Sequence, residues 1–135
     1  MPVSYTIDAD AKLIRTKCSG NLTLQEVLNH FRELRNDPAC PDYLDVRLDL
    51  TEVTTLPESQ QLRAVGYEIG RVREKVRFGL CAAIAPGDAL FGMLRVFEAI
   101  TEGFFRQLAV FRTAAEADAW LDSNRGSGTP PKTQS

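Results

Sequence analysis

Alternating apolar and polar residues open the chain and predict two β-strands. In residues 3–7 the apolar side chains stand at every second position, and residues 12–18 repeat that pattern. Successive side chains of a strand point to opposite faces of a sheet, so this period of two indicates strands with one buried face. Residues 8–11 offer a turn between them. The two strands are therefore expected to form an antiparallel hairpin.

A capping signature and a helical period predict a first helix between Thr23 and Asp37. Thr23 and Glu26 have the spacing of a capping box, in which each side chain accepts a hydrogen bond from a backbone amide of the other residue. Apolar residues then recur at helical spacing, and the proline after Asp37 ends the pattern. His30 falls between Glu26 and Glu33 and is expected on the polar side of this helix.

A further strand and helix follow. Leucine and valine alternate with charged residues over positions 44–50, which predicts a strand with one wetter face, near an edge of the sheet. Residues 51–56 are expected to form a polar loop. Pro57 suits the first turn of a second helix, which is expected to end near Lys75.

The rest of the pattern predicts a buried strand, a helix, a strand and a short helix. Residues 78–85 are apolar on both faces, as in a central strand that helices cover on both sides. A proline and a glycine break this strand, and Asp88 is placed to cap a helix over residues 88–100. Residues 108–111 are expected to be the last strand, and a second capping box at Thr113 starts the final helix.

The predicted element order, ββαβαβαβα, defines the fold class. Strands that alternate with helices of this length favour an α/β fold, because right-handed crossovers place each helix against a parallel sheet. We therefore predict a five-stranded mixed sheet with an N-terminal β-hairpin and about four helices, in one domain over residues 1–124. Residues 125–135 are rich in glycine, serine, threonine and proline and are expected to be a disordered tail.

Composition and charge narrow the class of function. The 135 residues carry a net charge of -2 and include a single histidine. The balanced charge argues against binding of nucleic acid, and the shortage of histidine argues against enzymes that use it as a base or zinc ligand. The chain has no glycine-rich phosphate loop and no nucleophile beside a recognisable base. We expect no catalytic residues, no metal and no cofactor.

The cysteines and the apolar stretches bear on the compartment. Cys18, Cys40 and Cys81 form no C-x-x-C pair, a usage typical of a reducing cytosol, and Cys18 and Cys81 are expected to be buried thiols. No leader segment follows Met1, and no stretch reaches the roughly 18 apolar residues that span a bilayer. The prediction is a cytoplasmic protein that does not span a membrane.

Three local strings carry a resemblance to a known family. The string at the start of the first helix consists of Gly20, Leu22, Thr23 and Glu26. The string within helix 88–100 consists of Gly92, Met93, Arg95, Phe97 and Glu98. The string in the last strand and helix consists of Val110, Phe111, Ala117, Trp120 and Leu121. Their order and spacing resemble the STAS fold, the module of anti-sigma-factor antagonists and sulfate-transporter tails, and specifically its SpoIIAA-like branch. The resemblance covers residues 3–122. It implies the fold predicted above and a binding function, which in this branch is associated with lipids or other apolar small molecules.

A fourth string, residues 49–53, resembles the strand end that precedes the regulatory helix of antagonist proteins. In those proteins the next residues resemble D-S-S-G, and phosphorylation of a serine at the helix start switches partner binding. Here residues 57–60 read PESQ, so Glu58 stands at the usual acceptor position and only Ser59 remains. This departure argues against a phosphorylation switch.

Two loops at the carboxyl ends of predicted parallel strands are candidate binding sites, because ligands bind there beside helix N-termini. The candidate residues are Thr51, Thr54, Thr55, Glu58 and Ser59 in and after the first loop, and Gly87, Asp88, Phe91 and Arg95 in and after the second. One interpretation is that a partner or an anion binds there, although both carboxylates repel an anion. The other is that the hydroxyls and Asp88 only cap helices and turns.

Large apolar side chains gather in and after helix 88–100. Phe91 lies off the core stripe of that helix, and one of Phe104 and Phe105 is expected to face outward. An exposed apolar patch marks an interface or a ligand groove, so a homodimer through this helix is a further expectation. Arg95 is expected to form a surface ion pair with the glutamate three residues later. The two glycines at positions 66 and 70 are expected to pack tightly on the sheet, and the alternatives are a dimer seam or the floor of a ligand pocket.

These observations lead to two functional hypotheses. The first is a non-enzymatic STAS-like module that binds a protein partner or a small apolar ligand through the loops before the second and third helices. The alternative is a carrier of a lipid or an apolar small molecule. A carrier requires an enclosed apolar cavity of about 300 Å³ or more, here between helix 88–100 and the sheet.

Overall fold

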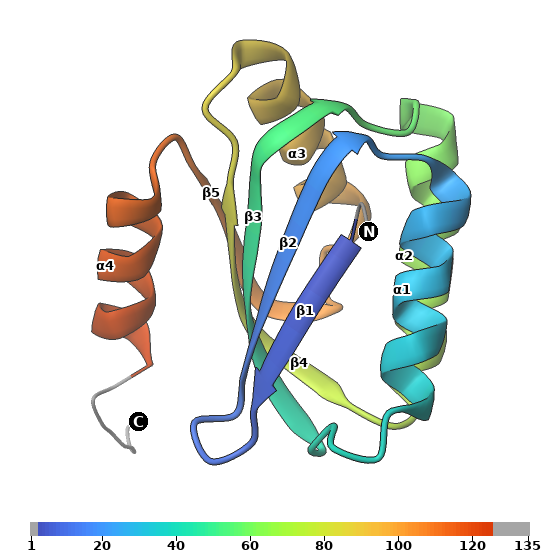
Figure 1. The fold of residues 1–135 in the computed structure, drawn as a ribbon, viewed down its shortest axis with the longest axis vertical. Helices are drawn as coiled ribbons and strands as arrows, with labels where there is room; N and C mark the ends of the chain where they lie inside the picture. Colours follow the sequence, from blue (N-terminus) through green and yellow to red (C-terminus); the bar gives the residue numbers. More distant parts are fainter. Residues whose placement is uncertain (1–2, 126–135) are drawn as a thin grey trace.

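The computed structural model describes residues 3–125, and its elements follow one another in the predicted order (Figure 1). The strands are β1 (Val3–Asp8), β2 (Leu13–Asn21), β3 (Tyr43–Thr55), β4 (Arg77–Ile84) and β5 (Phe105–Phe111). The helices are α1 (Leu24–Asn36), α2 (Ser59–Val72), α3 (Asp88–Ile100) and α4 (Ala114–Asn124). Arg125, the first residue of the predicted tail, is the C-cap of α4. The rest of that tail lies outside the described residues.

The five strands form one mixed sheet in the order β1-β2-β3-β4-β5. β1 and β2 are antiparallel and the other neighbours are parallel, which confirms the predicted hairpin and the α/β class. The prediction that residues 44–50 lie near a sheet edge is wrong, because β3 is the middle strand. The charged face of β3 is tolerated in the middle of the sheet because α4 provides an opposite charge. Arg47 Nε of β3 lies 2.7 Å from Asp118 Oδ1 of α4.

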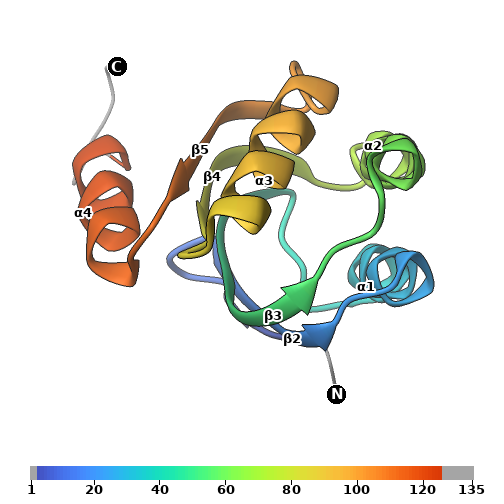
Figure 2. The same ribbon diagram turned by 90° about the horizontal axis from the view of Figure 1, so that it is seen from above.

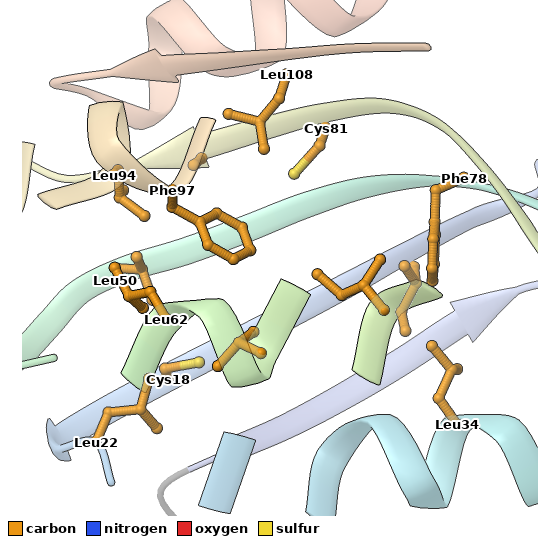
Figure 3. Close-up of a cluster of buried hydrophobic side chains, with 14 of the residues drawn as sticks. Cys18, Leu22, Leu34, Leu50, Leu62, Phe78, Cys81, Leu94, Phe97 and Leu108 are labelled. Carbon is orange, nitrogen blue, oxygen red and sulfur yellow. The ribbon is translucent and has the colours of Figure 1, made fainter. Parts of the chain in front are cut away.

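Three helices cover one face of the sheet and one covers the other (Figure 2). α1, α2 and α3 enclose the main core, in which Leu50, Leu62 and Phe97 come together from β3, α2 and α3 (Figure 3). On the opposite face Ala117 and Leu121 of α4 pack against β4. β4 is buried at seven of its eight residues. This confirms the prediction of a strand that helices cover on both sides.

β3 continues through the segment that was predicted to be a polar loop. Residues 52–55 pair with the end of β2, across two register shifts. Val53 is buried, and the Thr55 carbonyl accepts a hydrogen bond from the Leu22 N–H at 3.0 Å. Polar side chains on the open face of a strand give no local signal of its end, because backbone bonds to the neighbouring strand decide its length.

The capping box of α1 forms as predicted. Thr23 Oγ1 accepts a hydrogen bond from the Glu26 N–H at 3.3 Å, and Glu26 Oε1 accepts one from the Thr23 N–H at 2.9 Å. At the other end of α1, Lys75 Nζ donates to the carbonyls of Arg35 and Asp37 at 2.7 and 2.8 Å. Lys75 therefore lies beyond the end of α2 and closes the C-terminal end of α1, where a cation is favoured.

α2 packs closely against the end of α3. A Cβ at Gly66 would stand 3.0 Å from Ile100 Cγ2, and one at Gly70 would stand 3.6 Å from Phe104 Cζ. The expectation that these glycines pack on the sheet is therefore wrong. The Arg73 guanidinium covers Phe104 from 5.4 Å. Phe104 and Phe105 are both half-buried, so neither faces fully outward, contrary to the expectation.

One buried carboxylate joins three parts of the fold. Asp45 of β3 is 5% exposed. Its Oδ1 accepts hydrogen bonds from the Leu80 N–H at 2.8 Å and from the Tyr43 hydroxyl at 3.0 Å, and its Oδ2 accepts one from Arg125 Nε at 2.9 Å. Asp45 lies at the register shift between β3 and β4. Its side chain supplies an acceptor to a β4 amide at this irregularity in the ladder.

Gly79→Ala is expected to lower the free energy of unfolding by about 3 kcal/mol. The added Cβ would stand 1.8 Å from Tyr43 Oη and 2.3 Å from Asp45 Oδ1, so the carboxylate would have to leave its hydrogen bonds. Gly92→Ala in α3 is the matched control, because nothing lies within 4 Å of that Cβ and alanine favours a helix. Urea unfolding measures both variants. Equal stability of the two would contradict the role given to Asp45.

Candidate functional site

An open groove of about 1010 Å³ lies between the start of α2 and the exposed side of α3. Its apolar lining comes mostly from α3 and is here termed the floor: Leu56, Ala89, Leu90, Met93, Val96, Ala99 and Ile100. Its polar lining comes from the end of β3 and from α2 and is here termed the rim: Thr54, Thr55, Glu58, Gln60 and Arg63. We term this depression the α2–α3 groove. It combines apolar and polar surface, as protein interfaces do.

The topology of the sheet places both walls of this groove. β3 and β4 are parallel neighbours, and α2 and α3 begin just after their carboxyl ends, so both helices start at the same edge of the sheet. α3 carries two apolar stripes. Leu94 and Phe97 are buried in the core, whereas Met93 and Val96 line the groove. Val96 is 40% exposed, which is unusual for a large apolar side chain among the described residues.

Part of the first predicted loop reaches the groove. Thr54, Thr55 and Glu58 line it, and the Thr55 hydroxyl bonds to the Asn21 side chain. Thr51 does not line the groove, because it lies earlier in β3. There its hydroxyl and its N–H donate hydrogen bonds to Oδ1 of Asp49, two residues earlier, at 2.7 and 2.9 Å. Ser59 is the first residue of α2, and its side chain lies outside the described part of the structure.

The second predicted loop forms a separate cluster around an arginine that sequence reasoning missed. Gly87 is the N-cap of α3, so the expectation that Asp88 caps this helix is wrong. Asp88 Oδ1 instead accepts a hydrogen bond from Arg112 at 2.5 Å, and the guanidinium lies 4.2 Å from the centre of the Phe91 ring. Arg112 directly follows β5 at the same sheet edge, and its position after a predicted strand was the signal that could have identified it.

Arg95 belongs neither to the lining of the α2–α3 groove nor to the cluster around Arg112. Its Nε lies 3.0 Å from Glu98 Oε1, which confirms the expected ion pair, and its side chain is 63% exposed. It does not line the α2–α3 groove, since it projects from another side of α3 than Val96. Such an exposed pair contributes little to stability. A role for Arg95 in binding stays a prediction.

The main core contains a small, partly open apolar cavity. Its volume is about 100 Å³, and its lining includes Cys18, Leu62, Cys81 and Phe97, four of the side chains that Figure 3 labels. This is well below the roughly 300 Å³ that the carrier hypothesis requires. Burial raises the pKa of both the Cys18 and the Cys81 thiols to about 12. Both thiols are therefore protonated at neutral pH and are poor nucleophiles.

His30 is buried, contrary to the expectation that it lies on the polar side of α1. It is 9% exposed, and its ring packs against those of Tyr5 and Phe31, with centroids 5.3 and 5.2 Å away. Burial lowers the pKa of His30 to about 4. β1 covers this side of α1, and the helical period alone did not reveal that long-range contact.

Two further observations concern the described residues. Between residues 3 and 125 there is no group of three or more histidine, cysteine, aspartate or glutamate side chains placed to hold a metal ion. Over the same range, no helix has both the length and the apolar character that crossing a bilayer requires.

Comparison with known proteins identifies the fold. No protein-family model and no curated protein matches the chain. Among solved structures, the chain is similar to an uncharacterized protein of the DUF3478 family with a SpoIIAA-like fold from Shewanella loihica PV-4. The TM-score is 0.57 at 19% sequence identity, and the alignment covers 88% of this chain and 91% of that one. The chain has a SpoIIAA-like fold, as its sequence resemblance implied, and identity this low shows the fold alone.

The stability of the protein is expected to fall as the pH drops from 6.5 to 4. In this window the unfolded chain binds a proton at His30, because the usual pKa of histidine is 6.5. The folded chain does not, because burial lowers the pKa of His30 to about 4. The loss should reach about 3 kcal/mol relative to His30→Phe, which keeps a ring in place but does not titrate. Urea unfolding at each pH measures both proteins. A constant difference between them across this window would contradict the assignment.

Proposed function

We propose that the protein is a non-enzymatic binding module that engages a protein partner through the α2–α3 groove. The observation that carries the proposal is the exposed apolar floor, in which Val96 is 40% exposed, beside the polar rim. Exposed apolar surface of this kind is costly in water and marks interaction sites. A partner segment that presents apolar side chains to the floor and polar groups to the rim would match it.

The start of α2 supports binding without a phosphorylation switch. Glu58 is the N-cap of α2, and its N–H donates to Gln61 Oε1 at 3.1 Å. A carboxylate at this position gives the positive end of the helix a permanent negative charge. A partner would therefore meet the same charge at all times. The SpoIIAA-like fold supports a regulatory or binding role, although a fold does not by itself determine function.

The chemistry of the described side chains supports a role without catalysis. The only histidine of the chain is buried against aromatic rings and is uncharged at neutral pH. The Cys18 and Cys81 thiols are protonated at this pH. Neither supplies the activated nucleophile or the exposed base that a hydrolytic site needs. The three free cysteines also fit a reducing compartment, and we place the protein in the cytoplasm.

The volume of the internal cavity disfavours the carrier hypothesis. About 100 Å³ is less than the roughly 150 Å³ of an engineered cavity that binds benzene, so a lipid would not fit in it unless the core rearranged. The apolar surface available for binding is instead on the outside, in the α2–α3 groove. A protein partner is therefore favoured over a small apolar ligand.

Val96→Glu is expected to weaken partner binding at least about tenfold, because it places a charge in the apolar floor. A photo-crosslinking amino acid at position 96 first identifies the partner in cells, and calorimetry with the purified proteins then measures the affinity. Arg95→Glu is the matched control, since it adds the same residue to the same helix outside the groove lining. Both variants should melt within about 2 °C of the unaltered protein.

Equal affinity of Val96→Glu and the unaltered protein for the crosslinked partner would overturn the proposal. Weakening by Arg95→Glu alone would instead assign the contact to the other side of α3. Sedimentation of the isolated protein tests the homodimer separately. A dimer that Val96→Glu dissociates would make a second copy of the chain the partner at this groove.

A further inference from the structure

The outer edge of β1 has free backbone hydrogen-bonding groups. β1 is the first strand of the sheet and pairs only with β2, and no other backbone hydrogen bond reaches residues 3–8 from the described part of the chain. Figure 1 shows β1 at this edge, on the side of the sheet where α1 lies. The N–H and C=O groups along a free edge can pair with a strand of another chain.

β1 lacks the features that usually protect an edge strand from such pairing. Its six residues, VSYTID, include no lysine and no proline, and its pairing with β2 has no register shift. Proteins commonly place lysine, proline or a bulge at an exposed edge to prevent association. The single charge is Asp8 at the end of the strand. The edge is therefore open to a strand of about the same length.

A groove of about 730 Å³ runs beside this edge, between β1 and α1. We term it the β1–α1 groove. Val3 and Tyr5 line it from β1, and the side of α1 that faces it supplies Glu26, Asn29, His30, Arg32, Glu33, Asn36 and Asp37. The lining thus holds three carboxylates and one guanidinium. Glu26 caps α1 and Asp37 accepts the Tyr5 hydroxyl, which leaves Glu33 as the carboxylate without such a bond. The lining favours a segment that carries lysine or arginine.

His30 is an unusual member of this lining. It is only 9% exposed and lines both the β1–α1 groove and the internal cavity. Its Nδ1 has no hydrogen-bond partner among the described residues, whereas the neighbouring Tyr5 hydroxyl donates to Asp37 Oδ2 at 2.7 Å. A buried polar atom without a partner is costly to stability.

We propose that the β1–α1 groove is a second interaction surface, at which an extended, basic segment of a partner protein adds to β1 as a sixth strand. The main chain of the segment pairs with the free edge of β1. Alternate side chains point over α1, where lysine or arginine meets Glu33 and its neighbouring carboxylates. This surface is independent of the α2–α3 groove and does not depend on the function proposed there.

The charges favour a basic partner over a second copy of this chain. In a continuous sheet formed by pairing β1 with β1, the side chains beside the groove would again be apolar or uncharged, because Asp8 lies on the other face of the strand. A second copy would therefore bring no cation to the acidic lining. A six-residue segment that alternates threonine with lysine has both the extended tendency and the charge that the groove requires.

The test uses that threonine-lysine peptide and a threonine-glutamate peptide of equal length as probes. The lysine peptide should bind, more weakly as salt is added, and should protect alternate β1 amides from hydrogen exchange. Two further versions are N-methylated on opposite edges of the strand. If a sixth strand forms, methylation of one edge abolishes binding and methylation of the other does not. A purely electrostatic contact would tolerate both.

Glu33→Lys tests the charge of the groove. Glu33 is exposed and makes no hydrogen bond or ion pair that holds α1 together, so the fold should be unaffected. Affinity for the lysine peptide should fall about three- to tenfold. Asp122→Lys in α4 is the control, because it makes the same change in net charge on the opposite face of the sheet. It should leave the affinity unchanged.

Several results would overturn the proposal. Failure of the lysine peptide to bind would do so, as would binding that leaves every β1 amide unprotected. Equal weakening by Glu33→Lys and Asp122→Lys would show that only the overall charge matters. Protection of β1 that rises with protein concentration in the absence of peptide would assign the edge to a second copy of the chain instead.

Discussion

The hydrogen bonds of the buried Asp45 carboxylate are the interaction on which the arrangement of this sheet depends. A carboxylate taken out of water is destabilising unless donors surround it, and here a backbone amide of β4, the Tyr43 hydroxyl and the Arg125 guanidinium do so. Gly79 leaves the space that this cluster occupies. β3 and β4 lead into α2 and α3, so the register that Asp45 holds also sets where the two walls of the α2–α3 groove begin.

The fold presents two surfaces of different chemistry around one core. The α2–α3 groove has an apolar floor and offers side-chain contacts, whereas the β1–α1 groove is polar and lies beside free backbone groups. The core between them encloses only about 100 Å³. The domain is therefore better suited to hold two surfaces in position than to enclose a ligand. His30 lies where the core meets the second surface, which gives the single histidine of the chain a structural reason for its low pKa.

Much of the fold could be predicted from local patterns, and the errors share one cause. The capping box at Thr23, the hairpin and the buried β4 were predicted correctly, because each depends on residues close together in the sequence. The end of β3, the burial of His30 and the partner of Asp88 were not. Each depends on a distant segment: the end of β2, the edge strand β1, and the arginine after β5. In the candidate site, three of the five rim residues were proposed from the sequence, but the exposed stripe of α3 that forms the floor was not.

The sequence by itself determined the order of the elements, the α/β class and the near-neutral charge, because periodicity, caps and composition are local or additive properties. Only the tertiary structure decided that β3 is central, that one face of α1 buries its histidine, and that Val96 remains exposed. The physical reason is that an apolar or polar side chain has no fixed environment of its own. Its burial depends on which distant segment packs against it, and in this chain those contacts arise from strand order and helix placement.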